Sequence, residues 1–268
     1  HFRHHHRRLG AGSMDTAILA ALPVDAATFL VLFTRIGAVI MLLPAFSEES
    51  VPAQIRLMMA LGMTVGLYGL LAPRVAPLVQ GGDLAMMTFT EMLVGLAFGT
   101  IIKILFSAVA IAGSMVTQQI GLSSALVADP SLGGQSPLLA RLFGIAAVIV
   151  CMALGVHHLW IAGMVQSYTI FPVGGMPPVA DFAQLAVHVT GQALALGVSL
   201  AAPLILYGAL FNLGLGLAAR VAPQIQVFFI TQPLNLMLGL AVVSVVMGSI
   251  LTAFAAAMTS FMQSGWSF

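Results

Sequence analysis

Residues 106–130 read FSAVAIAGSMVTQQIGLSSALVADP. The stretch begins as an apolar helix and then takes up small and amide-bearing residues, among them Gly113, Gln118 and Gln119. It stops at Asp129-Pro130, because a proline disfavours helix at the residue before it. Backbone that leaves a regular helix at membrane depth is tolerated only where it is buried in protein or lines a wet cavity. We therefore expect the two halves of the chain to line a passage and this stretch to act inside that passage.

The composition excludes an ordinary soluble domain. The chain has 268 residues, of which 60% are hydrophobic and 6% charged, and its mean hydropathy is +1.08. A soluble domain carries about 25% charged residues. The apolar surface of this chain must therefore meet lipid or other apolar protein.

The first 13 residues, HFRHHHRRLGAGS, differ from the rest of the chain. They hold three of the nine Lys and Arg residues and four of the seven His residues. We expect a non-native or disordered tail at residues 1–13, with Met14 a plausible start. Without this tail six basic and eight acidic residues remain, and such a balance leaves no basic field for nucleic acid.

Six apolar blocks follow, at residues 26–46, 51–71, 84–120, 138–171, 182–219 and 225–262. About 20 residues of helix cross a membrane core, so four of these blocks are longer than one perpendicular span. The fifth block contains Pro203 and the sixth Pro233, and proline kinks or breaks a helix. We therefore predict one all-α membrane domain over residues 14–268, built from long helical hairpins that are kinked or broken at proline and glycine. Such hairpins suit a part of a larger helical assembly.

Five ionisable residues lie inside apolar segments, namely Arg35, Glu91, Lys103, Arg141 and Arg220. Charges at such positions are costly and are functional candidates by default. A proton path usually needs several carboxylates or histidines, whereas Glu91 is the one clear carboxylate in these segments. We favour pairing between helices or subunits. Glu91 and Lys103 are twelve residues apart, too far to pair along one helix, so each needs another partner.

The sequence offers no catalytic or metal motif that we recognise. His157 and His158 are adjacent and point to different helix faces, so they do not chelate like an i, i+4 pair. We instead expect them to lie with Trp160 at the membrane–water boundary. No G-x-S-x-G, H-E-x-x-H or phosphate-binding loop is present, and we predict neither enzymatic activity nor a cofactor. A secondary transporter remains an alternative, because helices broken by proline often hold substrate sites at mid-membrane.

Several motifs resemble one family. They are RIGAVIMLLPAFSEESVPAQIR at residues 35–56, Glu91-xxx-Gly95-xxx-Gly99, QQIGLSSALVADP at 118–130, HHLW at 157–160 followed by PVGG at 172–175, and NLGLGLAARVAPQIQVFFITQPL at 212–234. In this order they resemble the FliR component of the flagellar type III export gate. That family is related to the T component of virulence injectisomes, and overall similarity favours the flagellar form.

The resemblance implies a subunit that assembles with FliP-like and FliQ-like partners into a gate for unfolded flagellar proteins. It implies a multi-pass protein of the bacterial inner membrane and the flagellar basal body, which also meets the B and A components of the export apparatus. Residues 14–120 would be P-like, and the part from 138 to 268 would include the Q-like region. Structural or subunit-interface roles would fall to Arg35, Pro44, Arg56, Glu91, Lys103, Asp129, Pro130, Pro203, Asn212, Arg220, Pro223, Gln224 and Pro233.

The resemblance also places the pore plug of the family in residues 106–122. Its members here would be Phe106, Gly113, Ser114, Met115, Val116, Thr117, Gln118, Gln119, Gly121 and Leu122. Small residues and amides pack tightly yet leave little fixed charge to hold a sliding chain. Ser114 is neutral where the family leads us to expect an acidic residue nearby, which argues against a salt-bridged latch but not against a steric plug. A tight structural turn within the wall is the alternative.

Overall fold

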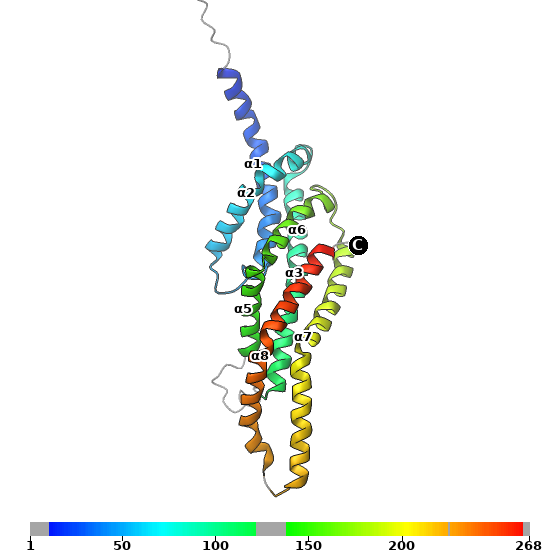
Figure 1. The fold of residues 1–268 in the computed structure, drawn as a ribbon. Coiled ribbons are helices and arrows are strands. Elements are labelled where there is room, and N and C mark those ends of the chain that lie inside the picture. Colours follow the sequence, from blue (N-terminus) through cyan, green and yellow to red (C-terminus); the bar gives the residue numbers. More distant parts are fainter. Residues whose placement is uncertain (1–10, 122–137, 225, 265–268) are drawn as a thin grey trace, which may run out of the picture. The chain divides into compact units, whose positions relative to one another are not determined.

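The computed structural model describes residues 11–121, 138–224 and 226–264, and in these residues it contains helices and turns but no strand (Figure 1). The helices are α1 (Ala11–Leu42), α2 (Ala53–Val79), α3 (Leu84–Gln119), α5 (Leu138–Ala153), α6 (Val156–Ile170), α7 (Val179–Val221) and α8 (Val227–Ser264). The prediction of an all-α fold is confirmed. Of the tail predicted at residues 1–13, the last three residues begin α1, and residues 1–10 lie outside the described part.

The helices are long and apolar enough for a multi-pass membrane protein. Five of those described meet the length and composition of a span, and α5 with α6 would make a sixth as one broken span. We predicted one continuous block over residues 138–171, and this is wrong, because α5 and α6 meet at an angle of 76°. The break falls at Gly155, whose φ of +75° lies in the left-handed region that only glycine adopts at little cost.

The helices continue through their prolines, so these can kink but do not end them. The second block, predicted at residues 51–71, is longer than expected, because α2 runs through Pro73 and Pro77 to Val79. α7 and α8 likewise continue through Pro203 and Pro233. All four prolines are exposed, so a helix can bend around each ring without disturbing its packed face. Figure 1 shows that α7 is not straight.

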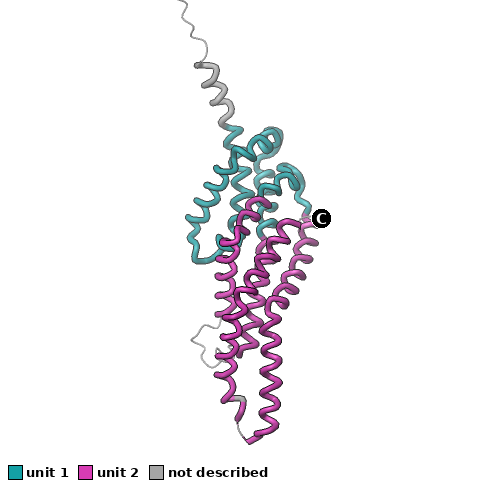
Figure 2. Tube along the Cα trace, in the orientation of Figure 1, with its two compact units in different colours: residues 1–99, 164–178 teal, residues 100–163, 179–268 magenta. Residues whose placement is uncertain are grey.

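The chain divides into two compact units (Figure 2). The first comprises residues 1–99 and 164–178 and contains the α1–α2 hairpin, the first part of α3 and the end of α6. Glycines bring its helices close, since a Cβ built on Gly95 would lie 2.6 Å from the carbonyl oxygen of Arg35, and one on Gly99 2.8 Å from the Cβ of Leu42. Small residues allow such backbone contact between apolar helices.

The second unit comprises residues 100–163 and 179–268. It contains the remainder of α3, α5, the start of α6 and the antiparallel α7–α8 hairpin. Its core includes Phe143 and Phe254, both 0% exposed. The ring of Phe106 on α3 meets that of Phe254 on α8 edge to face, with ring centroids 5.2 Å apart. This geometry suits the charge distribution of aromatic rings and fixes the predicted plug stretch at its first residue.

Candidate functional site

The predicted plug stretch is helical for most of the length that the structure describes. α3 continues without a break from Phe106 to Gln119, one residue short of the end of the block that we predicted at residues 84–120. The chain leaves the helix only at Ile120 and Gly121, where Gly121 has a φ of +77°. Leu122, Asp129 and Pro130 belong to the predicted sites but lie outside the described residues.

The last turns of α3 make very close contacts with α5 and α7. A Cβ on Gly113 would lie 2.5 Å from the Cα of Ala140 on α5, closer than real Cβ atoms approach other atoms. A Cβ on Gly197 of α7 would lie 2.7 Å from the Cγ2 of Ile111. No side chain larger than hydrogen fits at either glycine without separating two helices.

The same pattern continues to the end of α3. The side chain of Gln119 lies directly over Gly208 of α7, leaving no room there for a Cβ. The side chain of Ile120 occupies the equivalent place over Gly239 of α8, where a Cβ would meet its Cγ2. Ile120 is 0% exposed. The end of α3 is therefore enclosed by three helices of the second unit.

A small polar cluster surrounds the turn that follows α3. A Cβ on Gly121 would lie 2.9 Å from the Oε1 of Gln232 and 3.1 Å from the Nδ2 of Asn235, both on α8. Asn235 is buried, with 7% of its surface exposed. The hydroxyl of Tyr207 on α7 donates to the Oδ1 of Asn235 at 2.8 Å and also lies 3.0 Å from its carbonyl oxygen. These bonds tie α7 to α8 beside the turn.

The part of α3 that follows Lys103 contains no charged side chain. The hydroxyls of Ser114 and Thr117 donate to the carbonyls of Ala110 and Gly113 of the same helix, at 2.9 and 2.8 Å. Their polar groups are therefore satisfied locally. Of the predicted plug members, Val116 and Thr117 are buried, Gln118 is exposed, and Phe106, Ser114, Met115 and Gln119 lie between. The contacts of this end with its neighbours involve no ionised group.

A second site lies in the first unit, where Arg35 of α1 meets Glu91 of α3. The Nε of Arg35 donates to Glu91 Oε2 at 2.6 Å, and its Nη2 donates to Oε1 at 2.7 Å. Each residue is 1% exposed. Such a bidentate pair is among the strongest charge-assisted contacts.

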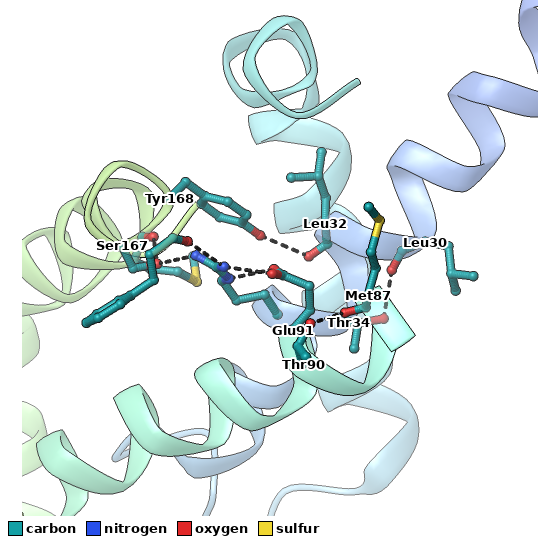
Figure 3. A network of polar contacts seen from close by, with 11 residues as sticks. Leu30, Leu32, Thr34, Met87, Thr90, Glu91, Ser167 and Tyr168 are labelled. Carbon is teal, nitrogen blue, oxygen red and sulfur yellow. Dashed lines mark hydrogen bonds and ion pairs between the residues drawn. The ribbon is translucent and has the colours of Figure 1, made fainter. Parts of the chain in front are cut away.

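The end of α6 and the residue after it complete this cluster on its third side, after α1 and α3 (Figure 3). Arg35 also donates to the hydroxyl of Ser167 at 3.3 Å and to the carbonyl of Phe171 at 2.8 Å. Its guanidinium carbon lies 4.2 Å from the centre of the Tyr168 ring, whose hydroxyl reaches back to the carbonyl of Leu32 at 3.3 Å. Arg35 thus joins α1, α3 and α6 within one unit.

The structure places Arg35 inside α1, about two turns before its end at Leu42, where it pairs with another helix of the same chain; its role at a subunit interface stays a prediction. Glu91 pairs with Arg35 and not with Lys103, which is exposed. The other predicted structural residues are not gathered at one site. Pro44 is buried in the turn after α1 and Arg56 is half-buried, whereas Arg141, Pro203, Asn212, Arg220, Pro223, Gln224 and Pro233 are exposed.

The histidine pair and Trp160 lie at the start of α6. His157 and His158 follow the bend at Gly155, with ring centroids 4.0 Å apart. Trp160 is 1% exposed, so its ring is covered by the chain itself, and its placement at the membrane boundary stays a prediction. In the described parts of the chain, no group of three His, Cys, Asp or Glu side chains could hold a metal ion.

Sequence reasoning missed several residues of these two sites. Ser167, Tyr168 and Phe171 complete the Arg35 cluster, and Tyr207 and Asn235 join α7 to α8 beside the turn after α3. Glycine positions carried a usable signal, because Gly197, Gly208 and Gly239 recur on α7 and α8 at the points where α3 makes contact. A single sequence does not show which neighbour such glycines receive.

Comparison with known proteins gives a consistent result. The bacterial export proteins, family 1, match residues 26–261. The flagellar biosynthetic protein FliR of Caulobacter vibrioides is 37% identical over 219 residues, covering 81% of this chain and 87% of that protein. FliR of Escherichia coli K12 is 32% identical, covering 80% of this chain and 81% of its own length. FliR of Bacillus subtilis 168 is 31% identical, covering 78% and 81%. The chain therefore belongs to family 1 of the bacterial export proteins, the family of the flagellar FliR proteins.

Proposed function

We propose that this chain is a structural and gating subunit of the flagellar type III protein export apparatus. With P and Q subunits it forms the channel through which unfolded flagellar proteins leave the cytoplasm. Membership of the flagellar FliR family supports the export role, since this family consists of structural export components and not of enzymes. The observation that carries the gating role is the enclosure of the uncharged end of α3.

A gate for unfolded chains has to be tight when closed and must not bind what passes through it. Glycine contacts at Gly113, Gly197, Gly208 and Gly239 make the closed packing tight. The residues of α3 after Lys103 are uncharged, so the end of this helix presents no ionised group to a passing chain. We infer that the end of α3 blocks the passage by its bulk and moves aside during export.

The exposed apolar surface supports assembly with partner subunits. Leu206, Leu210, Leu213 and Leu217 recur along α7 with 56–63% of their surface exposed. This spacing puts them on one helix face, and exposed apolar surface of this extent needs lipid or partner helices to cover it. FliP-like and FliQ-like subunits are the partners that we infer, followed by the B and A components. We further infer a place in the inner membrane and the flagellar basal body, with a P-like region at 14–120 and a Q-like region within 138–268.

The plug can be tested with Gly113. Gly113→Asp forces a side chain against the backbone of α5 and introduces a charge, so we expect leakage of ions or small molecules in cells that express the whole apparatus. Deletion of residues 113–119 should leak more. Ser114→Asp is the matched control, because it brings the same charge to the next, half-buried position without the backbone collision, and it should leak much less.

Assembly has to be measured in the same strains, by co-purification with the P and Q subunits and native mass determination. A discrete hetero-oligomer that contains the leaking variant supports the proposal. Gly113→Asp and deletion variants that are as tight as the wild type would show that α3 is not the plug. If the wild type forms only a monomer or homo-oligomer beside folded P and Q subunits, the proposed assembly is wrong.

A further inference from the structure

The first unit contains an apolar cavity that neither the ion-pair cluster nor the end of α3 uses. It lies between α1, α2 and the first part of α3 and has a volume of about 370 Å³. Phe33, Met41, Leu57, Met92 and Leu96 are among the residues that line it. Cavities of roughly 300–1,000 Å³ with mainly apolar walls and few polar groups are typical of sites for small ligands.

Two polar side chains line this cavity, and they differ in how they are satisfied. The hydroxyl of Thr34 donates to the carbonyl of Leu30 at 2.8 Å and is therefore occupied. Arg56 donates from Nη2 to the carbonyl of Glu48 at 2.6 Å. Its Nε is buried and has no hydrogen-bond partner among the described residues. A buried donor without a partner is costly, so this N–H needs an acceptor that the described residues do not supply, and the positive guanidinium favours an anionic one.

The size of the cavity distinguishes between a lipid chain and a helix of a partner protein. A whole helix about 10 Å wide does not enter a space of about 370 Å³ between three helices, so a partner helix would reach into it only with single side chains. A flexible hydrocarbon chain fits a narrow space of this kind, and the walls belong to three helices with the length and composition of membrane spans.

Charge at the mouth of the cavity indicates the headgroup. Arg56 lies in the first turn of α2, and the preceding loop carries the exposed carboxylates of Glu48 and Glu49. Arg56 donates to the main chain of Glu48, so the loop that it contacts carries two carboxylates, which disfavours a headgroup with a net negative charge. A phosphate on Arg56 with an ammonium group toward the two glutamates matches both signs, and the planar guanidinium suits phosphate in particular.

We propose that this cavity binds one phospholipid with a zwitterionic ethanolamine headgroup. Part of one acyl chain fills the space between α1, α2 and α3, the phosphate accepts from the free Nε of Arg56, and the ammonium faces Glu48 and Glu49. The lipid thereby stabilises the α1–α2 hairpin at the end where its connecting loop lies. This proposal needs only a membrane-embedded chain and holds whether or not α3 is a plug.

The test uses the full chain, purified in mild detergent with its co-expressed partners. It is incubated with equal amounts of phosphatidylethanolamine and phosphatidylglycerol, and the retained lipid is counted by native mass spectrometry. We expect one phosphatidylethanolamine on the wild type. Arg56→Gln should lower its retention about tenfold, the loss expected for one charge-assisted hydrogen bond.

Two glycine variants control for a general loss of structure. A Cβ on Gly37 would make only ordinary contacts with Ala60 and Phe33, so Gly37→Leu directs its larger side chain into the cavity and should also displace the lipid. Gly62 on α2 has nothing within 4 Å of a Cβ, and Gly62→Leu should leave retention unchanged. The proposal is overturned if both lipids are retained equally, if Arg56→Gln and Gly37→Leu retain as much as the wild type, or if the wild type retains no lipid.

Discussion

Replacing either member of the Arg35–Glu91 pair should destabilise the chain strongly, whereas replacing both should not. Arg35→Met leaves the carboxylate of Glu91 buried without its two donors. Glu91→Met leaves the guanidinium with only the Ser167 hydroxyl and the Phe171 carbonyl. The double variant removes both charges and fills similar space with apolar side chains.

The expected magnitude follows from the burial of the pair. Both residues are 1% exposed, and breaking a buried pair by removing one partner costs about 3–5 kcal/mol. That is a large share of the roughly 5–15 kcal/mol that stabilise a typical protein. Replacing a whole buried pair by apolar residues is often neutral or stabilising. Ser167 also keeps its bond to the carbonyl of Met164 at 2.6 Å, so we expect the double variant within about 2 kcal/mol of the wild type.

The assay is a double-mutant cycle on the free energy of unfolding, measured by denaturant titration in detergent micelles. Yield of the assembled complex, purified with the P and Q subunits, gives a second measure. Both single variants should lose assembly, and the double variant should recover most of it. Two single variants within about 1 kcal/mol of the wild type, or a double variant that is the sum of the singles, would refute the reasoning.

Two further substitutions, each compared with a control substitution, test local features, and the free energy of unfolding is measured for all four. Gly155→Ala should cost about 1–2 kcal/mol because its φ of +75° is left-handed, whereas Gly144→Ala, with open space at its Cβ, should stabilise α5 by up to about 1 kcal/mol. A Gly155 variant that is as stable as the wild type would contradict the bend. Tyr207→Phe should cost about 1–3 kcal/mol by leaving buried Asn235 without its donor, and the more exposed bond of Tyr68 to an aspartate makes Tyr68→Phe the milder control. If both tyrosine variants lose the same free energy of unfolding, the bonds of Tyr207 to Asn235 contribute no more than an exposed bond.

The sequence predicted the fold class and two of the buried charges, Arg35 and Glu91, for the same reason, whereas Lys103, Arg141 and Arg220 are exposed. Apolar blocks long enough to cross a membrane are visible in the composition alone, and a charge inside such a block is conspicuous. Pairing was less accessible, because Arg35 and Glu91 are 56 positions apart and no local periodicity links them. One of the groups that Arg35 contacts is a main-chain group, the carbonyl of Phe171. The sequence does not show where a carbonyl points.

The sequence did not show which prolines and glycines end a helix, and one cause explains this. Pro73, Pro203 and Pro233 are strong local signals for a helix break, yet each lies on an exposed face, where a bend does not disturb the packing. Gly155 is one glycine among 27, and its local sequence does not distinguish it from those that remain helical. Whether such a residue ends a helix depends on the neighbours that the fold supplies, and these are tertiary information.

The two sites also separate the gate hypothesis from the transporter alternative. A transporter that uses Glu91 for coupling needs this carboxylate to change partner or protonation state during each cycle. Glu91 instead accepts two bonds from Arg35, which is held by a third helix as well. Glu91→Gln should therefore destabilise assembly, because the amide turns an N–H group toward the guanidinium. A transporter would keep its assembly and lose only solute movement. Charge in this chain holds helices together, and the moving part that we propose, the end of α3, is uncharged.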